Sequence, residues 1–387
     1  MPRRLYLDAH ATTPADPEVV AAMLPFFNGM HGNPASPHHI QGSEVAAAVH
    51  KARESVARLI GASAHEILFT SGTTESNNLV IQGAAAHSLT AGAQVVTAAT
   101  EHSSVIDPCQ AMARRGAQLC ILPVDECGRL QSTDLEESLA VPTGLVTLMA
   151  ANNEVGTLHS MPEIAALTGP RRVLLHTDAA QAVGHIPVDV EAWGVDFLSL
   201  SGHKFYGPKG AGALYIRGGT SGAELTPVLH GGGQEDGLRP GTLNVPAIVG
   251  LGKACRLAEG RLATDAPRLA ILRDRLQGRL AAGLEGVVVN GAEDARLPHN
   301  LNIPIPGVHG SRLATEVEHL ALSTGSACAS ALTKPSHVLL ALGLSREAAD
   351  CSIRFGLLRN AQASEIDEAA DRVISAVNRV RRLPPQA

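Results

Sequence analysis

The chain has 387 residues, of which 45% are hydrophobic and 18% charged, a balance typical of a folded globular protein. Its formal net charge of −6 argues against direct nucleic-acid binding, and the lack of a run of about 18 apolar residues argues against a membrane span. The first residues include two arginines but no apolar core, so we expect no secretory signal and predict a cytoplasmic protein.

Strand-like and helix-like segments alternate through the first part of the chain. A helix is predicted between Ser43, as its N-cap, and Gly61, where it stops. Short apolar runs then predict buried strands at residues 66–72, 94–100, 117–124, 144–152, 171–179 and 195–202. Helical segments separate these runs, so we predict an α/β fold whose mostly parallel sheet has helices on both faces.

The pattern changes after about residue 250. Residues 251–284 predict one long helix or two consecutive helices, and short strands and further helices follow. Residues 364–383 predict an amphipathic helix. We therefore predict a large domain over residues 15–250 and a smaller α+β domain formed by residues 1–14 and 251–387.

Polar residues gather where several predicted strands end. Thr73 and Thr74 lie in a turn that can offer hydroxyls and backbone N–H groups to an anion at a helix N-terminus. His102 and Asp178 follow two further strands, and Gln181 follows Asp178 by three residues. Because open parallel sheets bind ligands at the carboxyl ends of their strands, these side chains are expected to converge on one crevice.

Lys204 lies in the segment SLSGHKFYGPKG (199–210), a glycine-bracketed loop between two apolar runs. Taken singly, each of these polar residues is more typical of a cap or a surface position than of a functional site. Taken together, they supply what pyridoxal phosphate requires: a lysine for the Schiff base, a carboxylate for the pyridinium nitrogen and a cradle for the phosphate. We therefore predict pyridoxal phosphate as the cofactor.

The cysteines show no CxxC pair and no zinc-ligand spacing, so we predict neither a disulfide framework nor a metal site. They are Cys109, Cys120, Cys127, Cys255, Cys328 and Cys351. Small and polar residues surround Cys328 in LSTGSACASALTKPSHV (322–338), a composition that predicts a mobile, accessible loop. The other cysteines lie in apolar or helical contexts typical of inert core positions.

The order of motifs SGTTESNN, EHSSV, NNEVG, HTDAAQ, SLSGHKFYGPKG and GGGQE resembles the cysteine desulfurases of the IscS/NifS type. These are pyridoxal-phosphate enzymes of fold type I in the class V aminotransferase family. The resemblance runs from YLDAHATTP near the start to SIRFGL at residues 352–357. It implies an enzyme that removes sulfur from L-cysteine, leaves L-alanine, and works as a homodimer.

The resemblance also implies catalytic roles. Lys204 would carry the cofactor as a Schiff base, Asp178 would pair with the pyridine nitrogen, and Gln181 would hydrogen-bond the ring hydroxyl. His102 would stack on the ring and move protons. Cys328 would attack the sulfur of the bound cysteine and become a persulfide, for which a thiolate is required.

Further roles concern binding. The phosphate would be held by Thr73, Thr74, Ser201, His203 and, from a second subunit, Thr242. Asn153 would lie beside the ring and the substrate. Arg354 would clamp the substrate carboxylate in a bidentate geometry that lysine does not offer.

The sequence does not identify the protein that accepts the sulfur. An iron–sulfur scaffold, a tRNA-thiolating enzyme and a DNA-phosphorothioation system all fit, and the TGSAC setting of Cys328 favours direct transfer to a partner protein. Asp236 departs from the family pattern, which usually has an arginine there. The alternatives are a selenocysteine lyase, another class V aminotransferase, or a sulfur-carrier or scaffold protein without catalytic turnover.

Overall fold

The computed structural model describes residues 4–220, 225–317, 319–324 and 335–382. Cys328 lies outside these ranges. In the described part of the chain, no helix is both long and apolar enough to cross a membrane. The helices are α1 Pro17–Met23, α2 Pro25–Asn28, α3 Ile40–Leu59, α4 Thr73–Ala91, α5 Ser103–Arg114, α6 Ser132–Ser138, α7 Met161–Thr168, α8 Val190–Trp193, α9 Val245–Gly283, α10 Gly310–Glu316, α11 His337–Ala341, α12 Arg346–Asp350 and α13 Ala363–Arg382.

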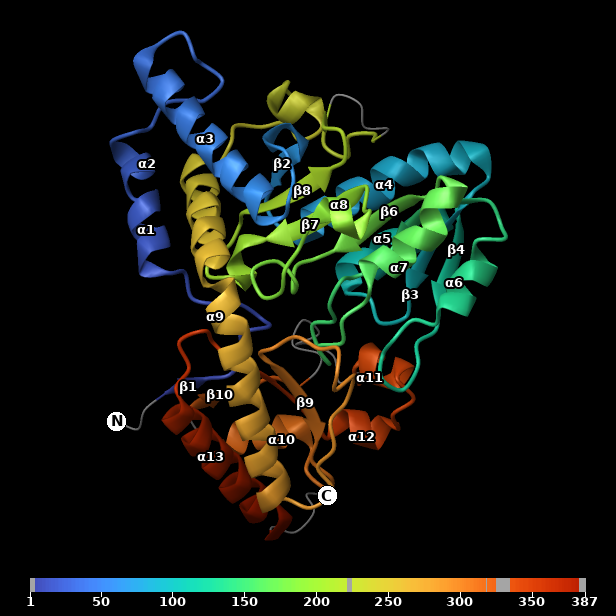
Figure 1. The fold of residues 1–387 in the computed structure, drawn as a ribbon, viewed down its shortest axis with the longest axis vertical. Helices are drawn as coiled ribbons and strands as arrows, with labels where there is room; N and C mark the ends of the chain where they lie inside the picture. The colour runs from blue at the N-terminus through green and yellow to red at the C-terminus, as the bar shows by residue number, and fades with distance from the viewer. Residues whose placement is uncertain (1–3, 221–224, 318, 325–334, 383–387) are drawn as a thin grey trace.

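A seven-stranded sheet forms the centre of the upper half of the molecule (Figure 1). Its strands, in spatial order, are β2 Ile67–Thr70, β8 Gly212–Ile216, β7 Phe197–Ser201, β6 Leu174–Asp178, β5 Thr143–Thr147, β3 Gln94–Ala98 and β4 Gln118–Leu122. All neighbouring pairs are parallel except those of β8, which runs antiparallel to β2 and β7. The predicted mostly parallel sheet and its strands are confirmed, with each strand shorter than its apolar run.

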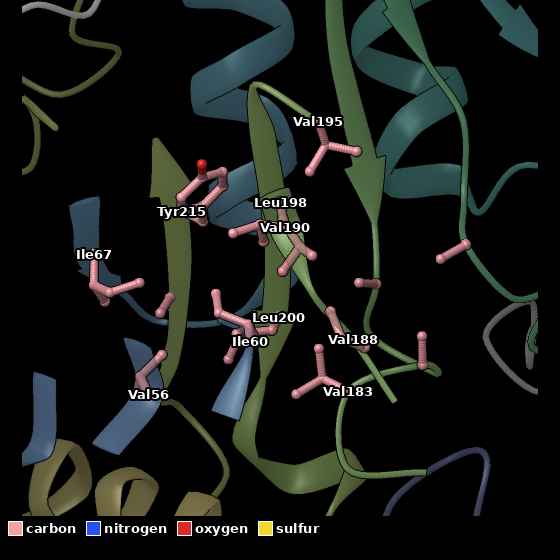
Figure 2. Packing of buried hydrophobic residues seen from close by; sticks show 14 of the residues in the cluster. Val56, Ile60, Ile67, Val183, Val188, Val190, Val195, Leu198, Leu200 and Tyr215 are labelled. Atoms are coloured by element: carbon pink, nitrogen blue, oxygen red, sulfur yellow. The ribbon is translucent and has the colours of Figure 1, made fainter. Parts of the chain in front are cut away.

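Helices pack on both faces of this sheet, and successive side chains of a strand point to opposite faces. In β8, Leu214 packs with helices α4 and α5 on one face. Its neighbour Tyr215 packs with α3, α7 and α8 on the other face. Figure 2 shows the second packing, in which Tyr215, Leu198 and Leu200 meet Ile60 and Val190. The predicted helices on both faces are therefore present.

Helix α3 begins before the serine that the sequence predicts as its N-cap. His39 caps it instead, because its Nδ1 accepts a hydrogen bond from the N–H of Gly42 at 3.0 Å. Ser43 lies inside the helix and donates its hydroxyl to a carbonyl one turn back. Histidine is not among the usual N-cap residues, which explains the error. The predicted stop is confirmed, since Gly61 takes a left-handed φ of +72° just after the helix.

Helix α9 is a single helix of 39 residues, with Pro267 inside it. It packs against α3 beside the sheet and continues into the lower half of the view, where α13 packs against it (Figure 1). A Cβ at Gly252 would lie only 2.6 Å from the Cα of Ala52, so the close approach of α9 and α3 requires a glycine there.

A second apolar core lies in the lower half and is separate from the cores on the sheet. It contains side chains of α9 and α13 and of the antiparallel pair β9 Asn300–Pro304 and β11 Ser352–Gly356. Leu5 and Leu7 join it, because β1 Leu5–Tyr6 pairs with β10 Leu320–Ala321. The division into a large domain over residues 15–250 and a smaller one formed by residues 1–14 and 251–387 stays a prediction.

Candidate functional site

The turn after β2 is shaped to hold an anion. Gly72 has φ +149°, and a Cβ there would lie 3.4 Å from the Oγ of Ser201, so the turn and the end of β7 line the same spot. Thr73 begins the 19-residue helix α4, and its Oγ1 is buried with no hydrogen-bond partner among the described residues. Thr74 is exposed beside it. A phosphate would give the orphaned hydroxyl and the first N–H groups of α4 a partner.

Asp178 and His102 are joined through two residues that the sequence analysis missed. The amide of Asn77, wholly buried on α4, donates to the Oδ2 of Asp178 at 2.8 Å and to the Oγ of Ser104 at 2.9 Å. The same hydroxyl lies 2.8 Å from the Nδ1 of His102. The spacing of Thr73 and Asn77 places both on one face of α4, which is the signal in the sequence that points to Asn77.

His102 both caps a helix and faces the site. It is the N-cap of α5, and its Nδ1 accepts a hydrogen bond from the N–H of Ser104 at 3.1 Å. Because Nδ1 is an acceptor in this geometry, the neutral ring carries its hydrogen on Nε2. The half-buried imidazole is thus oriented by its own helix, with its hydrogen on Nε2.

Lys204 and Gln181 meet at one carbonyl. Lys204 ends the short helical turn Gly202–Lys204 after β7, and its Nζ donates to the carbonyl of His10 at 2.6 Å and to that of Ala11 at 3.0 Å. The Nε2 of Gln181 donates to the same His10 carbonyl at 3.1 Å. The structure therefore brings these two predicted residues together beneath the N-terminal segment, which the sequence analysis did not include in the site.

Arg354 reaches the site from β11, in the second core. Its guanidinium is buried and donates to the Oδ1 of Asp8 at 2.9 Å and to the carbonyl of Asn153 at 3.0 Å. Its Nε is buried without a hydrogen-bond partner among the described residues. Arg354 and Asn153 are thus adjacent, and the Nε of the arginine is left for a further acceptor.

Two buried carboxyl groups, those of Glu101 and Glu154, are next in sequence to the site residues His102 and Asn153. Burial, and secondarily the charge of Asp178, raises the pKa of Glu101 well above its usual value. Burial raises the pKa of Glu154 to about 7, against the opposing effects of its hydrogen bond from Ser336 and the charge of Arg354. The hydroxyl of Ser336, the N-cap of α11, donates to Glu154 at 2.5 Å. Glu154 therefore ties the start of α11 to the site.

Three predicted site residues are not brought into these contacts. The ring of His203 is bonded to the hydroxyl of Thr12 at 3.0 Å, and burial beside Lys204 lowers its pKa to about 4. Thr242 is exposed, and no hydrogen bond of the described chain connects it to the others. Cys328 lies outside the described residues. Within those residues, no cluster of three or more histidines, cysteines and carboxylates could hold a metal ion.

The donor set fits pyridoxal phosphate. A buried carboxylate for the ring nitrogen, an anion-binding turn with an unpartnered hydroxyl, and a lysine beside them converge at the carboxyl ends of β2, β6 and β7. These are the three features that the cofactor requires.

Comparison with known proteins agrees with this reading. Residues 5–369 match the family model described as aminotransferase class-V. The chain is 46% identical over 381 residues to the cysteine desulfurase IscS of Anaeromyxobacter sp. (strain Fw109-5), covering 98% of this chain and 94% of that protein. A structure titled NifS-like protein is 34% identical, with a TM-score of 0.89 and coverage of 97% of this chain and 99% of that one. A structure titled SspA in complex with cysteine is also 34% identical, with a TM-score of 0.81 and coverage of 91% and 98%.

Proposed function

The chain belongs to the class V aminotransferase family as a cysteine desulfurase, and from this premise we propose how its own residues carry out the removal of sulfur from L-cysteine. Pyridoxal phosphate is the cofactor of this family; when bound, it supplies an electron-poor ring that takes up an electron pair from the bonds of the substrate. The proposal that follows assigns each residue a task around it.

Lys204 would hold the cofactor covalently through its Nζ, and Asp178 would keep the ring nitrogen protonated. The bonds from Asn77 and from the N–H of Ala180 hold the Asp178 carboxylate in one orientation for this task. Gln181 would face the ring hydroxyl. The phosphate contacts would come from Thr73, Thr74, Ser201 and His203, with Thr242 supplied by a second copy of the chain.

Arg354 would bind the carboxylate of L-cysteine, with Asn153 at its side. The pairing with Asp8 holds the guanidinium in one orientation, so that little side-chain entropy is lost when the substrate binds. The unpaired, buried Nε marks where a further oxygen is accommodated. His102 would exchange protons with the substrate through Nε2.

Cys328 would be the nucleophile of the sulfur-transfer step. Its thiolate attacks the Sγ of the bound cysteine, an S–S bond forms, and the Cβ–Sγ bond breaks. The electron pair of the broken bond passes to the carbon side, where protonation gives L-alanine. The enzyme is left with a persulfide on Cys328, which an acceptor protein then takes.

The observation that supports this proposal most directly is the meeting of Lys204 and Gln181 at the carbonyl of His10. Asp178 lies on the strand adjacent to the one that leads to Lys204. A covalently held pyridine ring needs a carboxylate, an amide and an amine close together. Asp178, Gln181 and Lys204 supply these three groups.

The test is product analysis with L-cysteine and a thiol reductant. We expect L-alanine and sulfide in equal amounts, and no oxo acid. A class V aminotransferase would give an oxo acid without sulfide, and a selenocysteine lyase would act on selenocysteine but poorly on cysteine. A sulfur carrier without turnover would give no alanine.

Three finer assignments belong to the same proposal. The enzyme would be a homodimer, since Thr242 is needed at the second site. The acceptor would be a protein that receives sulfur directly, in iron–sulfur assembly, tRNA thiolation or DNA phosphorothioation. The location would be the cytoplasm. Gel filtration, with copurification of persulfide-receiving proteins, tests the first two.

A further inference from the structure

Three histidine rings form a continuous stack beneath Lys204. The ring of His10 lies 4.4 Å from that of His299, with 29° between their planes. The ring of His299 lies 4.0 Å from that of His185, with 24° between their planes. All three side chains are at most 6% exposed. They come from three separate parts of the chain: the N-terminal segment, the loop after β6 and the residue before β9.

Hydrogen bonds fix the orientation of the first ring. The Nδ1 of His10 lies 3.0 Å from the Oε1 of Gln181, and its Nε2 lies 3.1 Å from the Nδ2 of Asn300. An amide oxygen only accepts and an amide nitrogen only donates, so His10 carries its hydrogen on Nδ1. The ring is therefore held from the large sheet on one side and from β9 on the other.

The histidines at both ends of the stack form hydrogen bonds with Lys204. The carbonyl of His10 accepts from the Nζ of Lys204 at 2.6 Å. At the other end, the Nε2 of His185 donates to the backbone carbonyl of Lys204 at 2.9 Å. The amine of Lys204 is thus bonded to the backbone of His10, whose ring begins the stack, and the backbone of Lys204 is bonded to the ring of His185, which ends it.

The surroundings keep these rings neutral. Burial is the main cause of a lowered pKa in all three, and it brings that of His185 to about 4. Positive groups act in the same direction: Arg354 and Lys204 face His10, Arg359 and Lys204 face His185, and Arg273 faces His299. Neutral rings stack without mutual repulsion, which a protonated pair would not do.

We propose that His10, His299 and His185 form a positioning stack that holds Lys204 by both its Nζ and its backbone carbonyl, so that the amine meets the aldehyde of the cofactor from one fixed direction. The inference rests on the proposed role of Lys204 and adds three residues to it. None of the three touches the reacting atoms, so they are positioning residues rather than catalytic ones.

The stack also connects two parts of the molecule. Asn300, which holds His10, lies on β9 beside the strand of Arg354. The stack therefore bridges the strand pair that carries Arg354 and the segment that carries Lys204. The nitrogens of the stacked rings do not converge, and no metal-binding cluster exists among the described residues, so the histidines do not form a metal site.

The test measures how fast Lys204 captures pyridoxal phosphate in the full chain freed of cofactor, without cysteine. Samples are reduced with borohydride at successive times, and the labelled Lys204 peptide is quantified by mass spectrometry. We expect His10→Ala and His299→Leu to slow capture about tenfold, the loss expected when a reacting amine is no longer held in place. We expect His10→Gln, which keeps donor and acceptor groups, to stay within about threefold of the wild type.

His176 provides the matched control, because it is an equally buried histidine that bonds Thr147 and Ser199 and takes no part in the stack. His176→Gln is expected to lower the melting temperature but leave the capture rate unchanged. Wild-type capture rates in His10→Ala and His299→Leu would overturn the inference. The inference would also be overturned if capture slowed in all variants, including His176→Gln, in proportion to the fall in their melting temperatures. If His10→Ala does not fold, His299→Leu and His10→Gln decide the question. A wild type that captures the cofactor but makes no alanine from cysteine contradicts the proposed function and leaves this inference standing.

Discussion

Asn77 connects the site at the scale of single residues. One buried amide donates to both Asp178 and Ser104, and Ser104 in turn contacts His102. In Asn77→Ala, Asp178 loses a hydrogen bond that fixes the orientation of its carboxylate. We expect kcat/KM for alanine formation to fall about tenfold, which corresponds to one charge-assisted hydrogen bond.

Asn78 is the control for this substitution. It is the next residue, half-buried, and its amide donates to the backbone carbonyl of Thr74, one turn back in the helix, and not to Asp178 or Ser104. Asn78→Ala is expected to change kcat/KM less than about twofold, because the hydrogen bonds to Asp178 and Ser104 are kept. Equal losses in the two variants would show that the Asn77 bridge has no catalytic importance.

Glu154 makes stability depend on pH. Its pKa is raised from 4.5 to about 7 in the folded protein, mainly by burial. The native state therefore binds more protons than the unfolded chain between these values, and the free energy of unfolding falls as pH rises through this window. At one pKa unit per about 1.4 kcal/mol, the change attributable to Glu154 is about 3 kcal/mol at most.

Glu154→Gln tests this, since glutamine keeps an acceptor for Ser336 but does not ionise. Thermal unfolding is measured from about pH 5 to about pH 8. The melting temperature of the variant minus that of the wild type should increase as the pH rises. Glu285→Gln, an exposed position, should follow the wild type throughout. A parallel course of wild type and Glu154→Gln would contradict the assignment.

Residue types and their positions after strands were enough to predict Lys204, Asp178, Gln181 and His102 as a group. They were not enough to find His10, because its importance depends on a contact with Gln181 across 171 residues, and no local pattern in the sequence carries that information. Asn77 was missed although its four-residue spacing from Thr73 points to it.

At the scale of elements, apolar runs predict strands well because buried parallel strands are apolar on both faces. Helix ends are less predictable, as His39 in place of Ser43 shows, because any side chain with an acceptor at the right place serves as a cap. The packing of one helix on another depends on single small residues. The contact between α3 and α9 is an example.

Gly252 tests this packing. Alanine favours a helix over glycine by about 1 kcal/mol, yet the new Cβ would collide with the backbone of Ala52. We therefore expect Gly252→Ala to destabilise the protein by about 1–3 kcal/mol in chemical unfolding. Gly260, in the same helix with nothing within 4 Å of the added Cβ, is the control, and Gly260→Ala should stabilise. Stabilisation by both substitutions would show that the contact is loose.

At the scale of the whole molecule, the site draws on separate cores. Asp178 ends β6 and Lys204 follows β7 of the large sheet, whereas Arg354 lies on β11 beside the second core, and Thr242 is exposed. If Thr242 completes the site of a second copy, Thr242→Ala should raise the Kd for pyridoxal phosphate about tenfold, the effect of one hydrogen bond to a charged group. Fluorescence titration measures this.

Mixed dimers sharpen the prediction. In a dimer of one Lys204→Ala chain and one Thr242→Ala chain, one of the two sites has both an intact Lys204 and an intact Thr242. Tight binding of pyridoxal phosphate should therefore return at that site. Thr264→Ala, at an exposed threonine of α9, should bind the cofactor like the wild type. Unchanged affinity in Thr242→Ala would remove this residue from the site.

The most direct test of the account is the mass of the peptide that contains Cys328 after reaction with L-cysteine in the absence of a reductant. We predict one additional sulfur atom on Cys328 in the wild type and in Cys127→Ser. We predict none in Lys204→Ala, which lacks the lysine that holds the cofactor. Two results would contradict the assignment of Cys328 as the nucleophile. One is release of alanine and sulfide while Cys328 gains no sulfur, and the other is a Cys328→Ser variant that releases sulfide at the wild-type rate.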